Sequence, residues 1–301
     1  MTSHARRPSA TGSIAAAPAA IPGNARGAAL LLVMWLIALL TALVGAFALT
    51  SHIENLQGRV LVRGLAAEQA ARAGLEYALT RVAAPEQERQ WLPDGRPYRW
   101  EFDDAEVEVR LIDEAGKIDL NAADAPLLTG LFQAVGVEQS EAAAISSAIL
   151  DWRDPDPLTQ PAGGAEDPEY AAAQRPYGAK DAPFDTVAEV EQVLGMTPAL
   201  YEKVVSHLTV YSGTAQPEVA FASTEVLTAM GQDPALVLAR RQTPGPTPLV
   251  ATPSGTYSVS SRARLRNGRE AVLRVVARAG ASGVPGSAYT PLRWEDGASP
   301  R

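Results

Sequence analysis

An uninterrupted apolar segment near the N-terminus constrains this chain more than any other feature. Residues 28–49, AALLLVMWLIALLTALVGAFAL, carry no charged side chain. As an α-helix rising ~1.5 Å per residue they extend roughly 33 Å, enough to cross a hydrocarbon core of ~30 Å. Arg6, Arg7 and Arg26 precede the segment, and no lysine or arginine follows it until Arg59. The positive-inside rule therefore predicts an N-terminus in the cytoplasm and the body of the chain across the membrane.

Two processing outcomes compete for this segment. Ala46-Phe47-Ala48 is an A-x-A tripeptide, after which a signal peptidase could cut. Against that outcome, apolar residues recur at helical spacing beyond the segment until Pro85, so residues 28–84 read as one helix of roughly 85 Å. A cut after Ala48 would sever this helix. The recurring positions are Leu56, Val60, Ala67, Ala70, Ala71, Gly74, Leu75, Ala78 and Val82.

Composition excludes several kinds of site. The 301 residues include no cysteine, so neither a disulfide framework nor a thiolate metal site can form. The formal net charge is −8, and such an acidic body repels nucleic acid and favours cations or basic partners. The three histidines, His4, His52 and His207, lie far apart in the sequence. No nucleophile elbow, P-loop or dinucleotide fingerprint occurs, so we expect no enzymatic activity.

The body reads as strands that flank a helical insertion. Residues 98–102 and 106–112 alternate apolar and polar side chains, which predicts a β-hairpin. A second hairpin is predicted over residues 257–278, with Asn267-Gly268 as a type I′ turn, and a last short strand over residues 289–294. Between the hairpins, Asn121 is a candidate helix N-cap, and residues 217–227 faintly repeat 118–128. Helices are predicted at 127–135, 140–152, 186–194 and 199–208, with a weaker helical unit over 214–241.

The front of the chain resembles type IV pilins and pseudopilins, in which a basic leader ends in Gly and an apolar helix continues into an amphipathic one. The resemblance implies that prepilin peptidase cuts between Gly27 and Ala28, that the apolar segment stays on the mature protein, and that the mature protein is methylated. Most pilins carry Glu as the fifth residue after the cut, where this chain has Leu32. A carboxylate at that depth is costly unless it is paired.

The order of four phrases over residues 113–213 is similar to the minor pseudopilin K family of type II secretion systems. These phrases are DEAGKIDLN, AILDWRD, GAEDPEY and APFDTVAEVEQVLGMTPALYEKVVSHLTVYSG. Absence of the pilin Glu at Leu32 fits the same family. The implied fold class is α+β: a long N-terminal helix on an antiparallel sheet, with an inserted all-α domain resembling SAM or helix-hairpin-helix domains.

This resemblance divides the chain into six parts. They are a leader (1–27), a transmembrane helix (28–49), the pseudopilin helix and first strands (50–116), a first helical domain with acidic loops (117–213), a second helical unit and loop (214–250), and C-terminal strands (251–301).

Two acidic loops are candidates for a metal site. Calcium takes six to eight oxygen ligands, which flexible carboxylate loops can supply, but the spacing here is not that of an EF-hand. From the residues alone a solvated acidic loop is the simpler interpretation. The resemblance favours calcium, because the K family binds calcium around such loops. The candidate ligands are Asp151, Asp154, Asp156, Glu166 and Asp167.

A helix-hairpin-helix motif raises the question of DNA binding. Residues 118–152 contain no lysine or arginine, so little counterion release could drive such binding, and we expect no nucleic-acid partner.

The sequence thus predicts a single-pass inner-membrane protein with a periplasmic body. The resemblance implies a minor pseudopilin at the tip of the type II secretion pseudopilus, which initiates or caps the fibre during protein export across the outer membrane. We expect its helix to pack beside the minor pseudopilins I and J through small residues such as Ala70, Ala71 and Gly74. Further implied partners are the major pseudopilin, prepilin peptidase, the secretin and secreted substrates. Alternatives are a minor pilin of a related type IV pilus, a released periplasmic binding protein and a DNA-uptake factor.

Overall fold

The computed structural model describes residues 25–84, 86, 89–242, 251–280 and 288–297. Residues 1–24 of the predicted leader and residues 243–250 of the predicted loop lie outside this description. The chain divides into two compact units, Met1–Leu61 and Val62–Arg301, and each is described by itself. The predicted long helix is confirmed: α1 runs without a break over Ala25–Val82.

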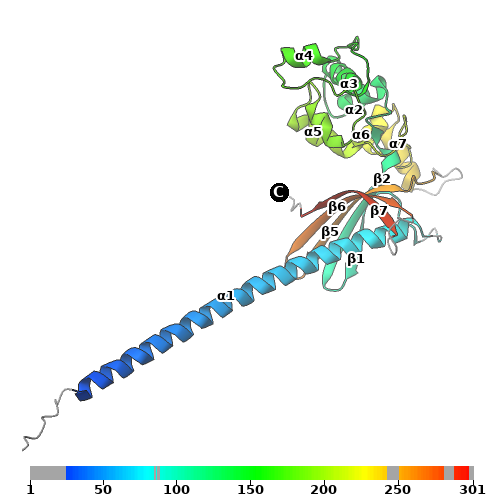
Figure 1. Ribbon diagram of the computed structural model, residues 1–301. Coiled ribbons are helices and arrows are strands. Elements are labelled where there is room, and N and C mark those ends of the chain that lie inside the picture. Colours follow the sequence, from blue (N-terminus) through cyan, green and yellow to red (C-terminus); the bar gives the residue numbers. More distant parts are fainter. Residues whose placement is uncertain (1–24, 85, 87–88, 243–250, 281–287, 298–301) are drawn as a thin grey trace, which may run out of the picture. The chain divides into compact units, whose positions relative to one another are not determined.

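The strands form one antiparallel sheet in the order β1-β2-β5-β6-β7. Both predicted hairpins are present (Figure 1), and the last short strand is also confirmed. The turn between β5 and β6 differs from the predicted type I′, because that type needs positive φ at both central residues and only Gly268 has it, at 82°. The strands are β1 (Asp94–Phe102), β2 (Ala105–Asp113), β5 (Thr256–Leu265), β6 (Glu270–Ala279) and β7 (Tyr289–Asp296).

The second half of α1 packs on one face of this sheet, and small residues make the close approach possible. Ala70 and Ala71 are buried in the core that the helix shares with β2, β5 and β6. A Cβ added at Gly74 would lie 2.3 Å from Ser261 Oγ and 2.8 Å from Val107 Cγ1. The expectation that these small residues contact partner helices is therefore wrong, because they contact the chain's own strands.

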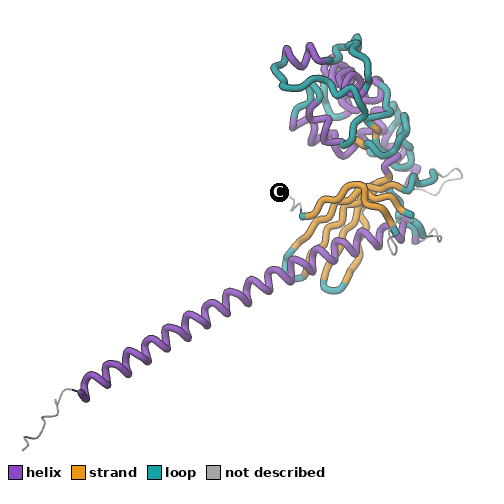
Figure 2. Tube along the Cα trace, viewed as in Figure 1, coloured by secondary structure: helices purple, strands orange, loops and turns teal. Residues whose placement is uncertain are grey.

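A helical domain is inserted between β2 and β5, which are neighbouring strands in the sheet. A short parallel pair, β3 (Ile118–Asp119) with β4 (Leu208–Thr209), brings the two ends of its first part together. Figure 2 shows these helices gathered in a cluster of their own. They are α2 (Ala125–Ala134), α3 (Gln139–Arg153), α4 (Asp167–Ala172), α5 (Pro198–Val204), α6 (Thr224–Ala229) and α7 (Pro234–Gln242), with 3₁₀ turns η2 (Glu114–Gly116), η3 (Val187–Gln192) and η4 (Val205–His207).

The faint repeat in the sequence is a structural repeat. The guanidinium of Arg153 donates to the carbonyls of Leu120 and Ala123, the latter at 2.7 Å. Arg241 donates in the same way to the carbonyls at the equivalent positions of the second copy, Val219 and Ala222. Each helix pair is thus joined to its preceding turn by one arginine from its second helix.

The N-cap of α2 is Asp124, whose carboxylate accepts from Leu127 N at 3.0 Å, and not the predicted Asn121. Asn121 instead binds the backbone of Phe184 through both ends of its amide, at 2.9 and 2.7 Å. This long-range pair ties the first turn of the helical domain to the segment before η3.

Replacing Gly74 with Ala should lower the stability of the chain by about 1–3 kcal/mol, because the new methyl group overfills the contact between α1 and the sheet. The matched control is Gly58→Ala on the same helix, where no atom lies within 4 Å of the added Cβ. There the better helix propensity of Ala should leave stability unchanged or raise it by up to about 1 kcal/mol. Thermal unfolding of the full chain in detergent measures both. An equal response of the two variants would contradict the packing described here.

Candidate functional sites: the apolar helix and the acidic loops

The first half of α1 carries an apolar segment that its own unit leaves uncovered. Ala29–His52 has a mean hydropathy of 2.6, and none of its most apolar window is buried. Leu32, at the position where most pilins carry Glu, is 71% exposed. Gly27 and Ala28, the predicted cleavage pair, lie in the first turns of the same helix. So large an exposed apolar surface needs lipid or other apolar helices around it.

The acidic loops place two carboxylates inside the helical domain. Asp151, in the last turn of α3, is fully buried, and Glu166, at the N-cap of α4, is 4% exposed. Asp151 accepts from the backbone N–H of Gln160 at 3.1 Å. Gly164 lies against it so closely that an added Cβ would sit 1.9 Å from Asp151 Oδ2. The loop between α3 and α4 therefore closes directly over a buried acid.

Burial and mutual repulsion disfavour the charged forms of the acids in this cluster. Burial, followed by repulsion from Asp151, Asp181, Asp154 and Asp156, raises the pKa of Glu166 to about 7. Burial also raises the pKa of Asp151 and of Asp154. Among the described residues, neither Glu166 Oε1 nor Asp154 Oδ1 has a hydrogen-bond partner. Buried carboxylate oxygens of this kind are costly unless a cation or a proton neutralises them.

Four of the five predicted ligands thus share one electrostatic environment: Asp151, Asp154, Asp156 and Glu166. The fifth, Asp167, begins α4 with an exposed side chain and is not among the groups that raise the pKa of Glu166. Sequence reasoning missed Asp181, which does act on Glu166. Asp181 has a positive φ of 54° and follows Lys180 in a segment with no acidic repetition, so no local pattern marks it.

The side chains of this cluster are of the types that bind a cation, but their positions do not form a complete binding site. Unpaired, buried carboxylate oxygens are the ligands that a hard cation such as Ca²⁺ prefers. Within the described ranges, however, no three acidic or histidine side chains converge closely enough to enclose an ion. A bound ion would therefore require the side chains of the α3–α4 loop to rotate toward one another.

A buried polar network joins the helical domain to the sheet. Lys117 Nζ lies 2.7 Å from Glu114 Oε1 and 2.6 Å from Ser258 Oγ on β5. The other oxygen of Glu114 accepts from Thr209 Oγ1 at 2.5 Å. Glu114 is 1% exposed, and each of its carboxylate oxygens has a partner. Because the network is paired internally, it is a structural junction and leaves no group free for a ligand.

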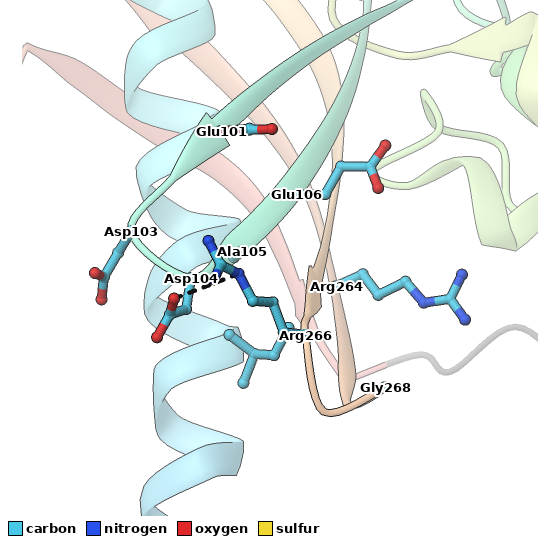
Figure 3. Close-up of a pocket in the computed structure, with 9 residues that line it drawn as sticks. Glu101, Asp103, Asp104, Ala105, Glu106, Arg264, Arg266 and Gly268 are labelled. Atoms are coloured by element: carbon cyan, nitrogen blue, oxygen red, sulfur yellow. Dashed lines mark ion pairs between the residues drawn. The ribbon is translucent and has the colours of Figure 1, made fainter.

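An open cleft of about 500 Å³ lies at the tips of the two hairpins (Figure 3). Its charged side chains come from both turns, and Asp104 pairs with Arg266 across them at 3.5 Å. Asp103 and Asp104 form the turn between β1 and β2, as the sequence predicts for exposed paired acids. Exposed and mutually paired charges of this kind stabilise a turn weakly and indicate no chemistry.

A long helix that is apolar in one half and packed on an antiparallel sheet in the other is the arrangement of pilin-like proteins. Comparisons with known proteins indicate which member of this class the chain resembles. The family model for type II secretion system protein K matches residues 108–213. The type II secretion system protein K of Klebsiella pneumoniae is 29% identical over 228 residues, which cover 65% of this chain and 68% of that protein. A putative protein K of Escherichia coli K12 is 25% identical, over 63% of each chain.

The fold has a solved counterpart. The chain matches a structure of the GspK-GspI-GspJ complex from the type 2 secretion system of enterotoxigenic E. coli, with a TM-score of 0.56. The identity is 19%, and the match covers 83% of this chain and 99% of the other. This confirms the predicted α+β fold. The chain is therefore similar to the type II secretion system protein K family, most specifically over residues 108–213, and its one apolar helix among the described residues is long and apolar enough to cross a membrane.

Without metal, the stability of the chain should fall as pH rises through the titration of Glu166. Its folded pKa of about 7 lies above its ordinary value of 4.5, so the native state holds the proton more tightly than the unfolded state. The stabilising contribution is complete below pH 4.5 and is lost as pH rises through 7. Melting curves between pH 5 and 8 in chelator should be steeper in pH for the wild type than for Glu166→Gln. Glu141→Gln, an exposed acid of α3, serves as the control and should keep the wild-type slope.

Proposed function

We propose that this chain is a minor pseudopilin of the inner membrane that assembles at the tip of the type II secretion pseudopilus. One observation carries the proposal: a single helix continues from an uncovered apolar segment into a face that is packed on a sheet. Such a helix holds a folded body to a membrane. Three arginines before the segment support a cytoplasmic N-terminus and a periplasmic body.

Assembly with minor pseudopilins I and J is supported by the name of the solved counterpart, a GspK-GspI-GspJ complex. Because Ala70, Ala71 and Gly74 are covered by the chain's own sheet, a partner helix would contact other residues of α1. Val62 and Leu65, which are 68% and 57% exposed, are the available apolar side chains on the described part of the second half. The inserted helical domain would occupy the space above the sheet and prevent addition of a further subunit. In this arrangement the major pseudopilin subunits would lie below this chain in the fibre.

The apolar segment would be retained after cleavage by prepilin peptidase between Gly27 and Ala28. Leu32 supports a terminal subunit, since a subunit with no neighbour stacked above it needs no carboxylate at this depth.

Expression with a prepilin peptidase should therefore yield a mature chain that begins at Ala28, read by N-terminal sequencing and intact mass, which also reports methylation. Gly27→Leu should leave the leader uncleaved, whereas Ala48→Leu, which removes the A-x-A tripeptide, should be processed normally. The mature chain should also co-purify with the I and J pseudopilins from detergent extracts. A mature protein that begins at Leu49 would contradict this proposal.

We further propose that the acidic loops bind calcium. The unpartnered oxygens of Glu166 and Asp154 and the repulsion among four carboxylates support a cation there. Asp151, Asp154, Asp156 and Glu166 would hold the ion, with Asp167 and Asp181 as neighbouring acids. The bound ion would neutralise the buried charge and fix the α3–α4 loop against the helical domain.

Calcium at about 100 times its dissociation constant should stabilise the native chain by ~2.7 kcal/mol, a rise in melting temperature of about 5–10 °C. Chelator should remove the rise, and magnesium at equal concentration controls for ionic strength. Asp151→Asn should abolish the effect because it removes a buried charge from the cluster, while Glu141→Gln should retain it. Equal melting temperatures in calcium and in chelator would refute calcium binding and leave the assembly proposal standing.

A further inference from the structure

A second cleft, of about 520 Å³, lies between the outer face of the sheet and the residues that follow α5. This is the face opposite α1, since Arg110 and Ser260 alternate along their strands with residues that pack on the helix, such as Val109 and Val259. The size is within the range of ligand clefts in proteins. The charged side chains around it are Arg110, Lys117, Arg274, Arg293 and Glu295.

Three of these four cations already have an acidic partner. Lys117 pairs with Glu114 at 2.7 Å, Arg110 with Glu108 at 3.2 Å, and Arg293 with Glu295. Arg274 has none among the described residues, although Glu295 lies opposite it in the β6–β7 register. Glu295 is held by Arg293 instead. The cleft therefore contains an unpaired guanidinium beside two further arginines.

The register places Arg274 in one cross-strand row with Arg110. Ser260 on β5 lies opposite Arg110 on one side and Arg274 on the other, so the two arginines are two strand spacings, about 10 Å, apart. The chain has an excess of acidic residues, with a formal charge of −8, yet no acid within the described ranges pairs with Arg274. An exposed arginine on a sheet is often only solvated. Arg274 is itself exposed, but it lines a cleft with aliphatic walls, in which a bound anion would be partly removed from water.

The walls also carry aliphatic side chains, Ile112, Val205 and Val276. A guanidinium takes a carboxylate or a phosphate in a bidentate manner, so charge alone leaves both open. The aliphatic walls favour a ligand in which an apolar group adjoins the anion. The net negative charge of the chain disfavours a polyanion.

We propose that this cleft binds an acidic peptide segment of a partner protein. Arg274 takes a carboxylate of that segment, Arg110 and Arg293 add positive potential, and the aliphatic wall receives a neighbouring side chain. The inference goes beyond the proposed function and depends neither on calcium nor on assembly with other pseudopilins.

The test uses the full chain in detergent micelles and two fluorescent tetrapeptides, acetyl-Leu-Glu-Glu-Leu-amide and its Gln-Gln counterpart, with binding read by anisotropy. The acidic peptide should bind at least about tenfold more tightly than the neutral one. Arg274→Gln should weaken that binding about tenfold, since it removes a charge-assisted hydrogen bond. The control is Arg240→Gln, at an exposed arginine of α7 that has no ion pair with any described residue; it makes the same change in net charge and should alter binding less than about twofold.

Arg274→Lys keeps the positive charge but removes the planar guanidinium that can bind a carboxylate with two hydrogen bonds. This variant should bind the acidic peptide more weakly than the wild type. Each variant must keep the wild-type melting temperature, which is expected because Arg274 makes no hydrogen bond or ion pair in the described structure. Equal binding of the two peptides, no binding at all, or equal losses in Arg274→Gln and Arg240→Gln would overturn the proposal. So would displacement of the peptide by inorganic phosphate at a similar affinity, because that result would indicate a simple oxyanion site.

Discussion

The close contact between α1 and the sheet is the constraint on which the rest of this fold depends. One helix has to satisfy two surroundings, an apolar one over Ala29–His52 and a folded core over its last turns. Gly74 and the alanines beside it let the helix axis approach the strands, and they bury apolar area on both elements. A larger residue there would push the second half of the helix away from the sheet and reduce the apolar area that both elements bury.

Buried polar interactions stabilise the inserted domain both where it joins the sheet and within its two repeated helix pairs. The Glu114–Lys117 pair with Ser258 and Thr209 is buried and fully partnered, so breaking it would leave a charge uncompensated. Arg153 and Arg241 have the same role in the two helix pairs, since each donates hydrogen bonds to two backbone carbonyls of the preceding turn. Equivalent contacts at equivalent positions indicate that the pairs α2–α3 and α6–α7 adopt the same local structure, with shorter helices in the second pair.

Periodicity along the sequence was sufficient to predict α1, both hairpins and most of the helices, because those features are local. It missed the short α4, which lies in a segment interpreted as an acidic loop, and the helix predicted over residues 186–194 is the 3₁₀ turn η3. What it could not supply were contacts between distant residues. Asn121 fits an N-cap by type, but its amide is taken by Phe184, far along the chain. The small face of α1 fits a helix–helix contact equally well as a helix–sheet contact, and only the three-dimensional structure distinguishes them. Asp181 joins the acidic cluster through folding alone.

Unpaired charges of opposite sign occur in two separate places in this chain. Among the described residues, Glu166 and Asp154 have buried oxygens without a donor, while the exposed guanidinium of Arg274 has no acidic partner. Unpaired buried charge is costly, so stability alone would favour neutralising the acids, whereas water can solvate the exposed guanidinium of Arg274. The acids lie in the α3–α4 loop and the arginine lies on the outer face of β6, so the fold keeps them on different elements. Groups that remain unneutralised within the chain are available to ligands from outside it, a cation in one place and an anion in the other.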